Sequence, residues 1–272
     1  MPDQDDVAQI VAFDLVDDVL DVGLLPGRHA LLVGEASHTY MAARTRVPAH
    51  PRGGGGRWQG KDGGMYTDAL TVTRRALHGV AELLLAGPQY RLSGTIRLRA
   101  FPGGFATVEE PSLRVDGDHL VTAHRRLSLG GVTVRELAAA AGVTAGAPEN
   151  LYSDGSGVGL DDQLQVEEAA ARMIAKGFGD GAEALRTLAP EVIPVLWPEH
   201  FDIGMTLDEV NYGVSTGDSQ LPEPYAYVGP WQPRTGPFWN VSFGAARPLT
   251  ELTDAAAIHT FFAEAHELAQ RD

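Results

Sequence analysis

Histidine, aspartate and glutamate stand close together within residues 195–243, and these residue types commonly transfer protons in enzymes. His200 and Asp202 are two residues apart, so on a β-strand their side chains point to the same face. Glu209 would join them from the neighbouring strand if the register of the hairpin allows it. We therefore predict that His200, Asp202 and Glu209 form a catalytic or ligand-orienting group.

Aromatic side chains surround these acids, and three of the four tryptophans of the chain fall within the same stretch. An apolar pocket with a few convergent polar groups is typical of a small-molecule site. The alternative is that the aromatic residues form the core of a sheet and the acids its solvated face. The predicted pocket is lined by Trp197, Tyr212, Tyr225, Tyr227, Trp231, Trp239 and Asn240.

Several other chemistries find less support in the sequence. There is no cysteine, which excludes thiolate nucleophiles, zinc ribbons and iron–sulfur clusters. Lys61 and Lys176 are the only lysines, and the fingerprints of dinucleotide binding, of serine nucleophile elbows and of HExxH metalloproteases are missing. We predict no cofactor and no metal, with an ion held by His200, Asp202 and Glu209 as an alternative.

A glycine-rich loop over residues 48–64 is a second candidate site. It contains four successive glycines, Gly53–Gly56, flanked by arginines, and backbone amides of this kind can bind phosphate. However, Lys61 is followed by Asp62, so the phosphate-loop motif is absent. We favour a surface loop or a lid.

The charge of the chain restricts its partners. The net charge is −15, and residues 131–272 carry 21 acidic against 7 basic side chains. An acidic surface repels nucleic-acid backbones, so no nucleic-acid partner is predicted. The first residues are acidic and no apolar run is long enough to span a bilayer, which indicates a cytoplasmic protein without a membrane partner. The oligomeric state is left open.

Hydrophobic periodicity predicts helices and strands in runs. We expect helices over 8–22, 66–86, 133–141, 161–176, 181–188 and 253–269. Strands are expected over 29–33, 90–101, 112–115, 120–123, 192–197, 202–207, 209–215, 225–228 and 239–243. Such runs favour an α+β fold, with mostly antiparallel sheets and packed helices, in one compact unit or two similar halves. The predicted halves are 1–148 and the acidic 160–272, joined by a polar linker over 149–159.

The C-terminal half resembles an uncharacterised bacterial family known only as a domain of unknown function. That family has a Trp-x-x-x-Phe-Asp-[Leu/Ile]-[Ala/Gly] strand, which corresponds here to Trp197 and Phe201–Gly204. A later Gly-x-x-x-Gly turn and a Tyr-x-Tyr strand correspond to Gly213…Gly217 and Tyr225–Tyr227, and a final strand and helix follow. The resemblance covers about residues 90–270 and implies one α+β unit with an aromatic–aspartate constellation. It implies no activity.

The leading hypothesis is a protein that binds or processes a small molecule in the pocket within 195–243. Hydrolysis or isomerisation by proton transfer is favoured over redox chemistry, because no dinucleotide fingerprint is present. The alternative is a non-catalytic interaction protein whose acidic surface binds a protein partner.

Overall fold

A computed structural model describes residues 63–152 and 155–271, all of which belong to one compact unit. The helix predicted over 8–22, the strand predicted over 29–33 and residues 48–62 of the glycine-rich loop lie outside the described residues.

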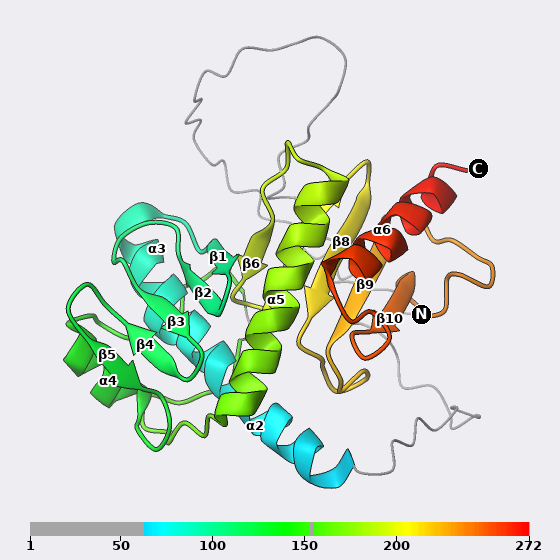
Figure 1. Ribbon diagram of the computed structural model, residues 1–272. Coiled ribbons are helices and arrows are strands. Elements are labelled where there is room, and N and C mark those ends of the chain that lie inside the picture. The colour runs from blue at the N-terminus through cyan, green and yellow to red at the C-terminus, as the bar shows by residue number, and fades with distance from the viewer. Residues whose placement is uncertain (1–62, 153–154, 272) are drawn as a thin grey trace, which may run out of the picture. The chain divides into compact units, whose positions relative to one another are not determined.

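One antiparallel sheet of ten strands runs through the described residues (Figure 1). Its order is β10-β9-β8-β7-β6-β1-β2-β3-β4-β5, so two runs of neighbouring strands meet where Leu98 of β1 pairs with Leu196 of β6. The α+β prediction is confirmed, and both predicted halves contribute to this sheet. The strands are β1 Leu98–Phe101, β2 Gly104–Thr107, β3 Arg114–Asp116, β4 His119–Val121, β5 Arg126–Ser128, β6 Val195–Trp197, β7 Asp202–Leu207, β8 Val210–Ser215, β9 Tyr225–Pro230 and β10 Ala245–Pro248.

Helices pack against this sheet and against one another. The longest, α5 (Glu168–Leu188), contacts strands of both runs, β1 and β2 on one side and β7 and β8 on the other (Figure 1). Helix α6 (Ala255–Ala269) lies beside α5 and contacts β8 and β9. The remaining helices are α2 Gly63–Val80, the π-helical turn η1 Ala81–Ala86, α3 Gly87–Ser93 and α4 Val134–Ala141.

Several predicted elements differ in the structure. The helix predicted over 66–86 continues through Gly87 and Pro88 into α3, and ends only at Gly94, whose φ of 77° is left-handed. Pro88 has no backbone N–H to donate into the π-helical turn before it, and the carbonyl of Leu83 in that turn accepts instead from the backbone N–H of Gly146 at 2.9 Å. The strand predicted over 90–101 is therefore reduced to β1. The helices predicted over 161–176 and 181–188 form the single helix α5, which begins only at Glu168, so residues 161–167 are not helical. The strand predicted over 239–243 is not formed, and β10 follows it at Ala245–Pro248.

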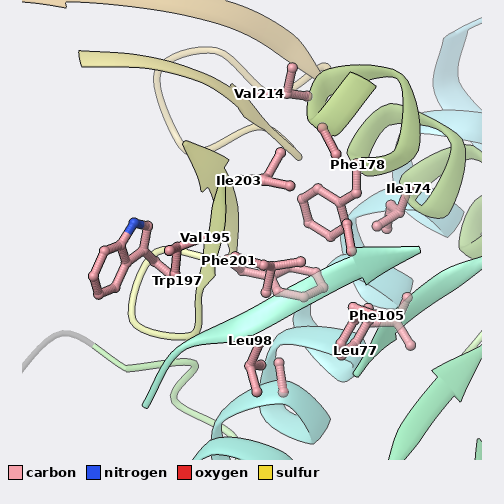
Figure 2. Close-up of a cluster of buried hydrophobic side chains, with 14 of the residues drawn as sticks. Leu77, Leu98, Phe105, Ile174, Phe178, Val195, Trp197, Phe201, Ile203 and Val214 are labelled. Atoms are coloured by element: carbon pink, nitrogen blue, oxygen red, sulfur yellow. The ribbon is translucent and has the colours of Figure 1, made fainter. Parts of the chain in front are cut away.

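An aromatic cluster forms the centre of the core beneath α5 (Figure 2). The rings of Phe105, Phe178 and Phe201 meet edge to face, with centroids 5.2 to 6.3 Å apart. This is the preferred geometry for aromatic pairs. Because Phe105 comes from β2, Phe178 from α5 and Phe201 from the turn before β7, the cluster joins the two runs of strands to the helix.

Two glycines allow α5 to approach the sheet closely. A Cβ atom added at Gly181 would lie 2.7 Å from a methyl group of Val214, and one at Gly177 would lie 3.0 Å from Leu249. A third glycine, Gly179, has open space where its Cβ would be. The helix thus carries one glycine that packing does not require and two at close contacts.

This difference predicts opposite effects for the same substitution. Gly179→Ala should raise the free energy of unfolding by about 0.5–1 kcal/mol, because alanine favours the helix without a clash. Gly181→Ala should lower it by about 1–3 kcal/mol, because Val214 must move. Urea unfolding of both variants measures this, and equal effects would contradict the packing described here.

Candidate functional site

The turn that joins β6 to β7 is fixed by Phe201. This residue is 1 % exposed, its φ is 51°, and its backbone N–H donates to the carbonyl of Trp197 at 2.9 Å. A left-handed conformation costs a non-glycine residue about 1–2 kcal/mol, which burial of the ring in the aromatic cluster offsets. The imidazole of His78 stacks on this ring and bonds the carbonyl of Pro198 at 2.7 Å. Glu199 and His200 are therefore presented by a rigid turn.

Glu199 is a buried acid at this turn. It is 6 % exposed, its Oε1 lies 3.7 Å from Nε2 of His200, and its Oε2 has no hydrogen-bond partner within the described part of the chain. Burial raises the pKa of the Glu199 carboxyl, and the nearby Asp202 raises it further, while His200 acts in the opposite direction. Ionisation of this carboxyl therefore costs more than ionisation of an exposed glutamate.

Asp202 is the first residue of β7, and its side chain lies on the face of the sheet that is turned away from α5. Its Oδ2 accepts a hydrogen bond of 2.6 Å from the hydroxyl of Tyr227, while Oδ1 has no partner among the described residues. Tyr227 pairs with Gly213, which pairs with Gly204, and Cβ atoms at these glycines would lie 2.5 and 3.1 Å from the Tyr227 hydroxyl. The phenol ring thus crosses β8 to reach Asp202 over two glycines.

Asn211 stands on the same face, in β8. Its Oδ1 accepts hydrogen bonds from Oγ1 of Thr206 at 2.7 Å and from Nε1 of Trp231 at 3.5 Å. Because the indole N–H of Trp231 can only donate, it assigns this end of the amide as oxygen, and the Thr206 hydroxyl then donates to the same atom. Its Nδ2 is consequently a donor, and it has no acceptor within residues 63–152 and 155–271. At 5 % exposure, this donor is buried.

These side chains enclose a pocket of about 20 Å³. Such a volume holds about one water molecule or the head of a larger molecule. Figure 2 shows the indole of Trp197 on the opposite side of β6 from the phenylalanine cluster, where it forms one wall. The full lining is Trp197, Glu199, His200, Gly204, Met205, Thr206, Asn211 and Tyr227.

A second layer of polar groups lies behind Glu199. Glu82 is buried in the π-helical turn η1 and accepts hydrogen bonds from the backbone N–H and the hydroxyl of Ser156, at 2.8 and 2.6 Å. Burial raises the pKa of Tyr152, as do the nearby carboxylates of Glu82 and Glu199. Burial lowers the pKa of His78, so its imidazole is neutral and Nε2 carries the proton that the Pro198 carbonyl accepts. π-Helical turns of this kind are frequent beside functional sites.

The structure brings four of the predicted residues together: Trp197, His200 and Tyr227 line the pocket, and Asp202 is bonded to Tyr227. Trp231 touches the pocket through its bond to Asn211. His200 lies in the turn before β7, so the expectation that it shares a strand face with Asp202 is wrong, and its nearest carboxylate is Glu199.

The other predicted residues lie elsewhere. Glu209 is exposed in the turn between β7 and β8, at the far end of the hairpin from Asp202. Tyr212 faces α6, where its hydroxyl lies 3.1 Å from Nδ1 of His266. Tyr225 donates to Asp218 at 2.8 Å. Trp239 packs edge to face on Phe238, and the exposed Asn240 bonds the backbone of Ala246.

Sequence reasoning missed Glu199, Thr206 and Asn211. Glu199 was inside the predicted motif, but alternation along a strand placed it on the face opposite His200 and Asp202. Thr206 and Asn211 are paired across β7 and β8, and a register count from the hairpin turn would have placed both beside Gly204 and Gly213.

Comparison of the chain with models of protein families, with curated proteins and with solved structures found no match. The resemblance to the uncharacterised bacterial family therefore stays a hypothesis. Among the described residues, no group of three or more His, Asp or Glu side chains is arranged to hold a metal ion. No helix in this part of the chain is both long and apolar enough to cross a membrane.

The buried acid predicts a pH-dependent stability. Because the folded pKa of Glu199 is raised, its neutral form favours folding below the ordinary glutamate pKa, and this contribution is lost as pH rises through the folded pKa. Glu199→Gln removes the ionisation. The free energy of unfolding of this variant relative to the natural chain should therefore increase as pH rises from 4 to 8.

Urea unfolding across this pH range measures the difference, with the exposed Glu191→Gln as the control. A difference between Glu199→Gln and the natural chain that stays constant with pH, or that falls, would contradict the assignment of a neutral acid.

Proposed function

We propose that this chain binds a small polar molecule in the pocket between the β6–β7 turn and β8. We further propose that Glu199 and His200 exchange protons with that molecule, as in a hydrolase or an isomerase that acts by proton transfer. Glu199 supplies the proton-bearing group and His200, whose side chain is 28 % exposed, connects the pocket with solvent. Histidine and glutamate are among the side chains that act as general acids and bases.

The observation that carries the proposal is the free Nδ2 of Asn211. Leaving a buried polar group without a partner costs about 1–3 kcal/mol. Asn211 and Glu199 both line the pocket, and Nδ2 of the one and Oε2 of the other are buried without a partner among the described residues. A bound molecule that satisfies both groups recovers this free energy. A surface used only for protein contacts needs no such cavity.

The first experiment asks whether a molecule is bound at all. Purified full-length chain is analysed by native mass spectrometry for a co-purified small molecule, and a metabolite panel is then tested by thermal shift. We expect a ligand that raises the melting temperature of the natural chain. Asn211→Asp should lose this response, because an acceptor replaces the free donor.

Asn150→Asp is the matched control, because it makes the same change at an exposed asparagine and should respond as the natural chain does. A ligand response that Asn211→Asp retains would place the binding site elsewhere. No ligand and no thermal shift in any variant would favour the alternative of a non-catalytic interaction protein.

A further inference from the structure

A row of arginines crosses strands β1 to β5 on the face of the sheet that is turned away from α5. Side chains paired across neighbouring antiparallel strands lie on the same face, so the register aligns one residue of each strand. The alternate residues form the buried face, where Phe105 packs on Phe178 of α5 and Leu120 is 0 % exposed. The arginine row therefore lies on the open face, and its three arginines are exposed. Its members are Arg99, Ala106, Arg114, Val121 and Arg126.

Local contacts hold two of these guanidinium groups without neutralising them. Nε of Arg99 donates to the carbonyl of Thr107 at 3.3 Å, and the guanidinium of Arg114 lies 5.9 Å from the centroid of the Phe101 ring. Neither arginine forms an ion pair within the described part of the chain, although the sequence has 36 acidic side chains. The remaining N–H groups of both guanidinium groups can therefore bind an anion.

The spacing of the arginine row fits an elongated anion. Neighbouring strands lie about 4.8 Å apart, so arginines on β1, β3 and β5 stand about 10 Å from one another. A single small anion contacts one or two of these guanidinium groups, whereas an anionic chain contacts all three. Arg126 pairs with Asp116 at 2.9 Å, but both side chains are partly exposed, and ion pairs of this kind are weak enough to open for a competing anion.

Ring side chains lie on the same open face. The register of β1 to β4 places Phe101 and His119 together in the row next to the arginines, and both are partly exposed. Bases of single-stranded nucleic acids stack on such rings and on guanidinium planes, while arginines bind the phosphates. An acidic polypeptide would instead gain its main-chain hydrogen bonds at the edge of a sheet. The combination of arginines and rings on a sheet face therefore favours a nucleic acid.

We propose that the open face of β1 to β5 binds single-stranded nucleic acid, with the arginine row on its phosphates and Phe101 and His119 beside its bases. The net charge of −15 does not decide against this, because the acidic surplus lies in residues 131–272. At 0.1 M salt, exposed charges more than about 10 Å apart are largely screened from one another. The sequence-based prediction of no nucleic-acid partner rests on those acids and does not cover this face.

The test titrates the full chain into fluorescently labelled oligo-dT and oligo-rU and follows the anisotropy between 50 and 200 mM KCl. We expect both to bind. Each phosphate contact of a single strand contributes about −0.7 to the slope of log association constant against log salt, so three contacts predict about −2. Arg114→Gln should reduce the steepness by about 0.7 and weaken binding about three- to tenfold at 50 mM KCl.

Two further variants separate charge from stacking. Arg186→Gln is the matched control, because it removes the same charge from an exposed arginine of α5, which packs on the opposite face, and it should bind as the natural chain does. Phe101→Leu keeps an apolar side chain but removes the ring, so it should weaken binding with little change of the salt slope. If Phe101→Leu does not fold by circular dichroism, the two arginine variants decide alone.

Three results would overturn the proposal. The first is absence of binding by both oligonucleotides at 50 mM KCl. The second is an equal effect of Arg114→Gln and Arg186→Gln, which would place any binding elsewhere on the chain. The third is tighter binding of a labelled poly-glutamate peptide than of either oligonucleotide, which would assign the face to an acidic protein. None of the substituted residues lines the pocket, so each of these results leaves the proposed function in place.

Discussion

The site depends on the burial of one phenyl ring in a strained turn. Phe201 has a φ of 51° and packs against Phe105, Phe178 and His78, which come from a strand and two helices. Because the ring is held from three sides, the turn cannot relax without opening the core. His78 adds a second restraint through the Pro198 carbonyl. The directions of Glu199 and His200 are thus set by the same contacts that join the two runs of strands.

The two acids beside this turn have different surroundings. Asp202 receives a hydrogen bond from Tyr227, made possible by glycines at 204 and 213. Oε2 of Glu199 receives none from the described residues, and burial favours its neutral form. Neighbouring carboxyl groups whose environments differ in this way can take different roles, one as a proton donor and the other as a fixed acceptor. Glu199 and Asp202 therefore differ in their hydrogen bonding, although both are buried carboxyl groups beside the same turn.

The sequence predicted the antiparallel hairpin of β7 and β8 within one residue, because its alternation and turn are local signals. It also located the stretch that contains the pocket. It could not predict that Phe201 turns left-handed, since bulky residues rarely do, and this one dihedral moved His200 off the strand. Trp239 and Tyr212 were assigned to the pocket for their residue type. Their actual partners, Phe238 and α6, are set by long-range packing that composition does not reveal.

Asn211 shows why a polar site can persist inside a sheet. Its oxygen accepts from both Thr206 and Trp231, and rotation of the amide would turn its NH2 group toward the indole N–H of Trp231, which can only donate. Replacing Asn211 with an apolar residue would remove the acceptor of both Thr206 and Trp231. Asparagine is therefore stabilised by its oxygen and remains available through its nitrogen.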